Sequence, residues 1–169
     1  MSDGIATIRY LTTSLFGHGA SRLLPDVLRE VGITRPFVVT DPGVRAAGVA
    51  DAVIDHLADA GSVCWFDRTP PNPTDTAVAE ATEALLAAGC DGVVAIGGGS
   101  SIDLAKGVAL LATHPGPFAR YAMVDGGDAL VTGAVLPNVA IPTTAGTGMD
   151  AFTHCVETFL SPRFNPPAD

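Results

Sequence analysis

The stretch "VVAIGGGSSIDLAKGVALLAT", residues 93–113, decides the fold that we expect for this chain. Its first residues are apolar throughout, which is typical of a strand that is covered on both faces of a parallel sheet. Three consecutive glycines follow this strand, which we place at Gly92–Ile96, and a helix is expected to begin near Ser101. The stretch therefore predicts a buried strand, a tight glycine turn and a helix in direct succession.

The glycine turn is suited to bind an anion. Glycine permits positive φ angles and lets the backbone approach a ligand closely. The free amides and the dipole at the start of the new helix then favour a diphosphate group. The spacing matches neither GxGxxG nor GxxxxGK[ST], so a tight turn without a ligand remains the alternative. The residues of this candidate diphosphate site are Gly97, Gly98, Gly99 and Ser100.

Asp103 and Lys106 lie one turn apart on the expected helix. The two side chains can form a surface ion pair of little energetic consequence. Alternatively, Asp103 orients the glycine turn or binds a ribose hydroxyl. Both interpretations remain open at this point.

Two further strand–helix units precede the glycine turn. A strand at Pro36–Thr40 ends at the turn signal "DPG", and residues 44–61 then show a helical pattern. A second strand at Ser62–Phe66 is followed by "PPNP", after which Thr74 can cap a helix that ends at Gly89. The apolar positions of the two helices are Val49, Val53, Ile54 and Leu57 in the first and Val78, Ala81, Leu85 and Leu86 in the second.

This alternation of strands and helices predicts an α/β fold, a Rossmann-like parallel sheet with crossover helices. The segment Gly116–Pro137 has no clear period and contains four glycines. We expect a long irregular excursion there, in which short strands remain open, and such loops often serve a ligand.

Composition narrows the class of protein. The chain has 169 residues, of which 47% are hydrophobic and 16% charged, enough apolar material for one domain or slightly more. A net charge of −9 argues against a nucleic-acid partner. The three cysteines form no CxxC pair, and the chain has neither a signal-peptide pattern nor the ~20-residue apolar run of a membrane helix. We expect a cytoplasmic protein that has no membrane partner.

Four motifs resemble those of the iron-containing (group III) alcohol dehydrogenases. "GGGSSIDLAK" (Gly97–Lys106) is similar to the GGGSxxDxAK segment of that family. "VTDPGV" (Val39–Val44) and "PNPT" (Pro71–Thr74) resemble its first and second nucleotide turns, and "IPTTAGTG" (Ile141–Gly148) resembles its nicotinamide-side loop. Order and spacing hold from about Ser14 to Gly148.

The resemblance implies an NAD(P)-dependent oxidoreductase that acts on alcohols and aldehydes. Asp41 would lie beside the adenosine ribose and favour NAD over NADP, because its charge repels a 2′-phosphate. The glycine turn would hold the diphosphate, and Thr143 and Thr144 would line the ribose and nicotinamide end. Without the resemblance, Asp41 and its two neighbours would be an ordinary turn.

A candidate metal half-site follows in "GMDAFTHCVETF", residues 148–159. Asp150 and His154 are four residues apart, so on a helix they project from one face. A carboxylate and an imidazole can share Fe²⁺ or Zn²⁺, and such a metal polarises an alcohol or carbonyl oxygen. A solvated pair or a helix cap is the alternative. The resemblance to the family's "GxDALTH" helix implies that both residues are ligands and favours Fe²⁺ over Zn²⁺.

The resemblance also divides the chain into a dinucleotide-binding α/β domain, residues 1–148, and the first helix of an all-helical metal-binding domain, residues 149–169. In the family a substantial segment separates the cofactor loop from the metal helix, whereas here they adjoin. We therefore hypothesise that Thr147-Gly148 is a junction, formed by a gene deletion or by an omitted segment. Two further histidines complete the family's metal site beyond the position of Asp169, so we expect half a metal site and no turnover by this chain alone.

The leading hypothesis is thus a metal- and NAD-dependent alcohol dehydrogenase. It would transfer hydride between the nicotinamide and the carbon of a small alcohol or aldehyde. The alternatives are a non-catalytic nucleotide-binding remnant, or a relative of glycerol dehydrogenase and dehydroquinate synthase. Association into a homo-oligomer remains open.

Overall fold

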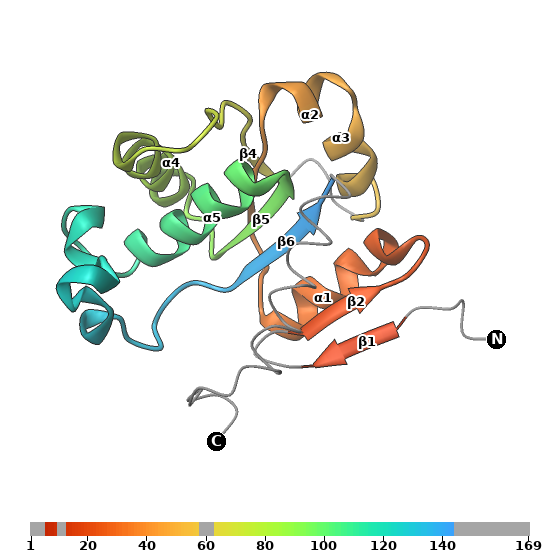
Figure 1. The fold of residues 1–169 in the computed structure, drawn as a ribbon. Coiled ribbons are helices and arrows are strands. Elements are labelled where there is room, and N and C mark those ends of the chain that lie inside the picture. The colour runs from red at the N-terminus through yellow and green to blue at the C-terminus, as the bar shows by residue number, and fades with distance from the viewer. Residues whose placement is uncertain (1–5, 10–12, 58–62, 144–169) are drawn as a thin grey trace.

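The computed structural model describes residues 6–9, 13–57 and 63–143. A parallel sheet of four strands in the order β4-β3-β5-β6 forms its centre (Figure 1). The strands are β3 (Pro36–Val39), β4 (Cys64–Phe66), β5 (Gly92–Gly97) and β6 (Asn138–Pro142). The predicted α/β fold with a parallel sheet is confirmed.

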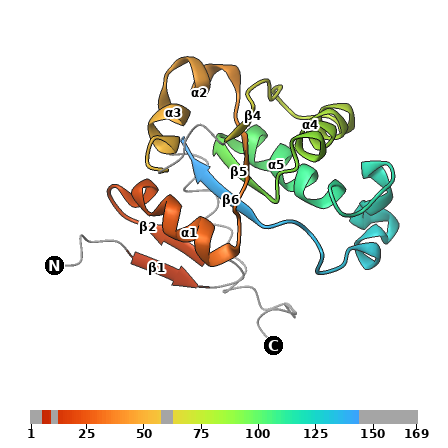
Figure 2. The same ribbon diagram turned by 180° about the vertical axis from the view of Figure 1, so that it is seen from behind.

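Helices cover both faces of this sheet, as Figures 1 and 2 show from opposite sides. On one face α4 (Asp75–Ala88) and α5 (Gly99–Leu111) pack against Phe37, Phe66 and Val93. The opposite face is covered by α1 (Leu24–Val31), α2 (Pro42–Ala46) and α3 (Val49–Ile54).

The apolar run of β5 is explained by this double cover. Side chains alternate along a strand, so Val93 and Ala95 face α4 and α5, whereas Val94 and Ile96 face α1 and α3. All four side chains are fully buried, with 0% of their surface exposed. The prediction of a strand covered on both faces is therefore confirmed.

The prediction of one helix over residues 44–61 is wrong. The chain forms α2 and α3 instead, because Gly48 between them adopts a left-handed φ of 70°. Val49 is consequently 41% exposed, while Val53 and Ile54 are buried as predicted. The expected stop at Gly61 lies outside the described residues.

The predicted ends of α4 are confirmed. The Thr74 hydroxyl accepts a hydrogen bond from the Ala77 amide at 3.3 Å, and Gly89 ends the helix with a left-handed φ of 64°. The apolar stripe extends only partly as predicted, because Leu86 is 57% exposed. Its other members, Val78, Ala81 and Leu85, are buried.

The excursion from Gly116 to Pro137 contains three short 3₁₀ helices and no strand, and the structure describes all of its residues. These helices are η3 (Phe118–Tyr121), η4 (Met123–Asp125) and η5 (Gly127–Leu130). His114 anchors the returning chain, since its Nε2 accepts a hydrogen bond from the Thr132 amide at 3.0 Å.

The N-terminal part forms a separate antiparallel hairpin, β1 (Ala6–Arg9) and β2 (Thr13–Phe16), which η1 (Ala20–Leu23) connects to α1. It lies beside the α1 side of the molecule in Figure 1. Among the helices of the described part, none is both long and apolar enough to cross a membrane.

Candidate cofactor-binding site

The predicted cofactor residues meet at the carboxyl edge of the sheet. The register pairs Val39 with Ala95 and Gly97 with Pro142, so β3, β5 and β6 end at a common edge. Asp41, the glycine turn and Thr143 follow these three neighbouring strands in that order. The Thr143 amide donates to the Gly97 carbonyl oxygen at 3.0 Å. The structure therefore places the predicted ribose, diphosphate and nicotinamide contacts along one line.

The helix after the glycine turn starts two residues earlier than predicted, at Gly99, with Gly98 as its N-cap residue. Ser101 cannot cap it, because its side chain is buried inside the first turn. The first bond of the helix runs from the Ile102 amide to the Gly98 carbonyl oxygen at 3.2 Å. The three preceding amides, those of Gly99, Ser100 and Ser101, lack acceptors within the helix, and in the described part of the chain no side chain caps it.

The glycines of the turn are explained by close packing and, among the described residues, by open space for a ligand, and not by a left-handed backbone conformation. None of Gly97, Gly98 and Gly99 has a positive φ. A Cβ atom on Gly97 would lie 2.5 Å from the Ser101 hydroxyl oxygen, so only glycine fits there. Among the described residues, a Cβ atom on Gly99 would meet no atom within 4 Å, so no described residue covers the start of α5. That the amides of this turn bind a ligand stays a prediction.

Asp41 is both a helix cap and a candidate ligand. Its Oδ1 accepts hydrogen bonds from the amides of Gly43 and Val44 at 2.9 and 3.0 Å, which fixes the carboxylate on α2. A Cβ atom on Gly97 would lie 3.3 Å from the other oxygen, Oδ2, so that oxygen borders the glycine turn. The cap therefore holds one carboxylate oxygen beside the glycine turn, and its role as a ribose ligand stays a prediction.

The turn after β4 packs against the glycine turn. The Asn72 amide donates to the Ser100 hydroxyl at 3.3 Å, and Asn72 holds a left-handed φ of 52°. Asparagine tolerates this conformation better than most residues. The motif "PNPT" indicated a nucleotide turn, but nothing in the sequence indicated that this amide contacts Ser100.

Three buried hydroxyls near these turns have no hydrogen-bond partner among the described residues: Thr40, Thr69 and Ser101. Each side chain is at most 2% exposed. An unsatisfied buried hydroxyl costs about 1–3 kcal/mol, so each of these oxygens favours a polar partner such as ordered water or a cofactor atom. Sequence analysis missed them, although Thr40 lies within the first nucleotide turn and Thr69 lies two residues before the second. The free amides, the carboxylate and these hydroxyls fit a polar dinucleotide.

Asp103 lies on the outer face of α5. Its Oδ1 is 3.1 Å from Lys106 Nζ, and the two side chains are 65% and 64% exposed, so the surface pair left open by the sequence is present. The pair borders a cavity of about 330 Å³ between α4 and α5, together with Thr74 and Phe118. A role of Asp103 in cofactor binding stays a prediction.

Several predicted features lie outside the described residues. These are Thr144, the metal ligands Asp150 and His154, the domain boundary at residue 148 and the hypothesised junction at Thr147-Gly148. Within the described ranges, no group of three or more His, Cys, Asp or Glu residues could hold a metal ion. The metal half-site therefore stays a prediction.

Comparison with known proteins gives the family. The sequence profile described as "Iron-containing alcohol dehydrogenase" matches residues 12–161. Because this match covers most of the chain, the chain belongs to the iron-containing alcohol dehydrogenase family. The resemblance inferred from the four motifs is confirmed.

Individual relatives agree with this assignment. The chain is 42% identical to the 4-hydroxybutyrate dehydrogenase of Cupriavidus necator, over 98% of its own length and 56% of that relative. The crystal structure of a 1,3-propanediol oxidoreductase superposes with a TM-score of 0.68 at 28% identity, covering 98% of this chain and 54% of that one. A sulfoacetaldehyde reductase from Bifidobacterium kashiwanohense, solved with NAD⁺, gives a TM-score of 0.65 at 25% identity, covering 89% and 52%.

The chain thus spans about half the length of the relatives that it matches. The alignment with the 4-hydroxybutyrate dehydrogenase extends over 213 positions, whereas the chain has 169 residues. At least 44 aligned positions of that relative, the difference between these lengths, therefore have no counterpart here. The hypothesis that Thr147-Gly148 is a junction, formed by a gene deletion or by an omitted segment, stays a prediction.

Proposed function

We propose that this chain forms the nucleotide-binding part of an NAD-dependent and metal-dependent alcohol dehydrogenase. The observation that carries the proposal is the open start of α5, where three amides without helical acceptors lie between Asp41 and Thr143. A diphosphate requires such N–H donors, and the helix dipole adds to their attraction. The family and the relative solved with NAD⁺ support the same conclusion.

Each side chain along the edge has a role in this proposal. Asp41 accepts hydrogen bonds from the adenosine ribose hydroxyls. It disfavours NADP, because a carboxylate repels a 2′-phosphate. Thr143 and Thr144 contact the ribose and the nicotinamide. The protein orients the cofactor, and the cofactor supplies the hydride chemistry.

The metal belongs to the segment beyond the described residues. Asp150 and His154 would supply two of its ligands, with Fe²⁺ preferred to Zn²⁺ on the evidence of the family. A divalent metal, when bound, polarises the oxygen of the alcohol or carbonyl group. Relatives named for 4-hydroxybutyrate and 1,3-propanediol support a short alcohol or aldehyde as the substrate. We further propose a cytoplasmic setting and leave a homo-oligomer as an open hypothesis.

A second candidate is a domain that binds NAD without turnover. It is favoured by the internal gap of at least 44 positions relative to the 4-hydroxybutyrate dehydrogenase. If that many residues were lost between the cofactor loop and the metal helix, the domain would still bind NAD but would not catalyse hydride transfer.

Two measurements on the whole chain test these candidates. Calorimetric titration with NADH detects the cofactor site directly, and absence of binding at millimolar NADH would remove both candidates. Anaerobic oxidation of 1,3-propanediol or 4-hydroxybutyrate with NAD⁺ and added Fe²⁺ or Zn²⁺ then separates them. Turnover selects the dehydrogenase, whereas NADH binding without turnover selects the binding domain.

A further inference from the structure

Arg45 lies one helical turn after Asp41 but does not pair with it. The Arg45 amide donates to the Asp41 carbonyl oxygen at 3.0 Å, so the two residues have the i, i+4 relation. Asp41 is the N-cap residue of the five-residue helix α2 and Arg45 lies in its last turn, so the two opposite charges belong to one short helix. In the described part of the chain, however, the Asp41 carboxylate has no ion-pair partner, and Arg45 is bound elsewhere.

Three side chains hold the Arg45 guanidinium. Its Nη1 donates to Asp51 Oδ1 at 2.7 Å, and its Nε lies 4.0 Å from Asp67 Oδ2. Its Cζ lies 3.6 Å from the centre of the Trp65 ring, within the range of a cation–π interaction. With 31% of its side chain exposed, Arg45 is partly shielded from water, which strengthens these contacts.

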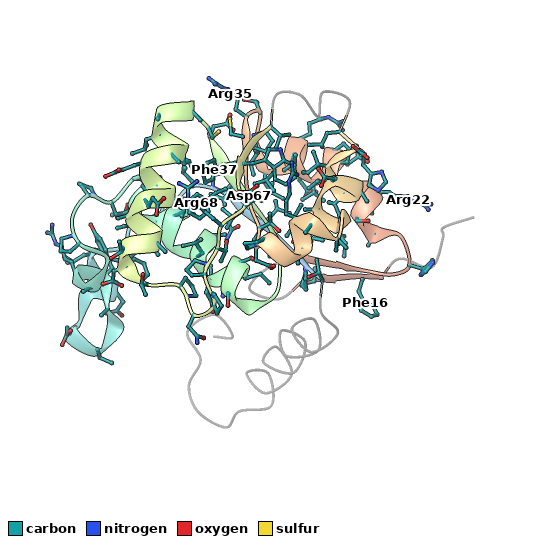
Figure 3. All side chains as sticks on the ribbon, turned by 90° about the horizontal axis from the view of Figure 1, so that it is seen from above. Phe16, Arg22, Arg35, Phe37, Asp67 and Arg68 are labelled. Atoms are coloured by element: carbon teal, nitrogen blue, oxygen red, sulfur yellow. The ribbon has the colours of Figure 1, made fainter. Side chains whose placement is uncertain are left out.

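The fold produces this arrangement. The left-handed turn at Gly48 reverses the chain after α2, so Asp51 in the first turn of α3 comes back to Arg45. Asp67 directly follows β4, the neighbour of β3, and is labelled near the middle of the view in Figure 3. The guanidinium is therefore held between α3 and the end of β4.

We propose that Asp51, Asp67 and Trp65 are specificity-determining residues that act by holding Arg45 away from Asp41. This inference rests on the proposed NAD site. A free Arg45 would neutralise Asp41 and could bind a 2′-phosphate through its planar guanidinium, which suits phosphate well. Because Arg45 is held by these three side chains, the charge of Asp41 stays uncompensated and the site selects NAD over NADP.

The chain contains a matched control on the other side of β4. Arg68 pairs with Glu80 at 2.6 Å and lies 4.5 Å over the Phe66 ring, so it has the same kinds of partner. Phe66 faces α4, whereas Trp65 packs with the α1–α3 side. Glu80→Gln frees Arg68 by removing one carboxylate instead of two, and it releases no cation on the helix that carries Asp41.

The test compares dissociation constants for NADH and NADPH, measured by fluorescence titration of the full chain. In Asp51→Asn/Asp67→Asn, the preference for NADH over NADPH is expected to fall about tenfold, the effect of one charge-assisted phosphate contact. Glu80→Gln should leave the preference unchanged. Adding Arg45→Gln to the double variant should restore the original preference.

Two outcomes overturn the inference while leaving the NAD site intact. One is a preference in the double variant within about twofold of the original. The other is a reduced preference that persists after Arg45→Gln, which would show that Arg45 is not responsible. If the unmodified chain binds no NADH, the proposed function and the inference fail together, and that result appears before any variant is compared. Asp51 and Asp67 are 47% and 50% exposed, so the fold should tolerate both substitutions, and circular dichroism checks this.

Discussion

The turn after β3 and the turn after β5 both lead into the N-terminus of a helix, but the two N-termini are capped differently. In both, an extended residue caps the helix: Asp41 has φ −102° and ψ 161°, and Gly98 has φ −83° and ψ −168°. The Asp41 carboxylate binds the first amides of α2, whereas no side chain of the described residues binds those of α5. The difference between the closed turn and the open one is therefore a single side chain, and our proposal places the bound diphosphate at the open turn.

The largest effect is expected from a substitution that adds a capping side chain to the open turn before α5. Gly98→Asp places a carboxylate where Asp41 has one, and the backbone of Gly98 suits a non-glycine residue. We expect NADH affinity to fall about a hundredfold or more, because the new carboxylate occupies the amides and repels the diphosphate. The free energy of unfolding should rise by about a few tenths of a kcal/mol, because Asp is a better N-cap than Gly.

Calorimetry with NADH and urea unfolding measure the two effects. Gly98→Asn is the control, because it caps the helix without a charge and should lose less affinity than Gly98→Asp. Unchanged NADH affinity in Gly98→Asp would mean that the amides of α5 do not bind the cofactor.

A second closed set of amides lies at the opposite edge of the sheet. The Asp91 carboxylate accepts hydrogen bonds from the amides of Thr34 and Arg35 and from the Thr34 hydroxyl. Asp91→Ala leaves these donors without their partner, so we expect a loss of about 2 kcal/mol in the free energy of unfolding at neutral pH. Urea unfolding measures the loss.

The same site has a defined pH dependence. Burial raises the pKa of the Asp91 carboxyl, but the hydrogen bonds from Thr34 and Arg35 outweigh it and lower the pKa below its ordinary value of 3.8. The unfolded chain therefore takes up this proton at a higher pH than the folded chain. The stabilisation is fully present above about pH 4 and is lost as the pH falls through the lower folded value. An Asp91→Ala deficit that is equally large at about pH 3 and pH 7 would contradict this account.

Asp41 separates the effect of a cap from the effect of a charge. Asp41→Ala should reduce the free energy of unfolding by about 1.5 kcal/mol, because two amides of α2 lose their acceptor. Asp41→Asn should cost little, since Asn caps helices as well as Asp does. Urea unfolding compares the two, and equal losses in both variants would show that the carboxylate charge, rather than the cap, stabilises α2.

The smallest predicted effect concerns the length of the helix that follows each turn, which is a second difference between the two regions. α2 has only 5 residues and α5 has 13, because Gly48 reverses the chain soon after the first. Gly48→Ala should cost about 1 kcal/mol from left-handed backbone strain alone, since a Cβ there meets no atom within 4 Å. Thermal unfolding measures this cost, and Gly48→Asn should lose less. No loss in Gly48→Ala would show that the chain can leave the left-handed turn freely.

The sequence predicts well wherever a local pattern and the packing agree. The apolar run of β5, the Thr74 cap and the Gly89 stop are all local signals, and the structure has each of them. Gly48 was missed because apolar residues recur at helical spacing on both sides of it. The strand β6 was missed because its apolar run has only three residues, Val139, Ala140 and Ile141, and stands between Pro137 and Pro142.

The candidate site also contains residues that a local sequence signal marks and residues that no such signal marks. Asp41, the glycine turn and Thr143 were predicted, because turn chemistry and family motifs mark them in the sequence. The contact of Asn72 with Ser100 and the hold on Arg45 depend on the sheet order β4-β3-β5, which brings together residues distant in the chain. No local pattern records such contacts.

The most direct test of the open turn is amide NMR of the ¹⁵N-labelled chain during titration with NAD⁺. If the bare N–H groups of α5 hold the diphosphate, the resonances of Gly99, Ser100 and Ser101 should shift most among the described residues. Saturating NAD⁺ that leaves these three resonances in place, or that moves amides far from this edge instead, would contradict the account.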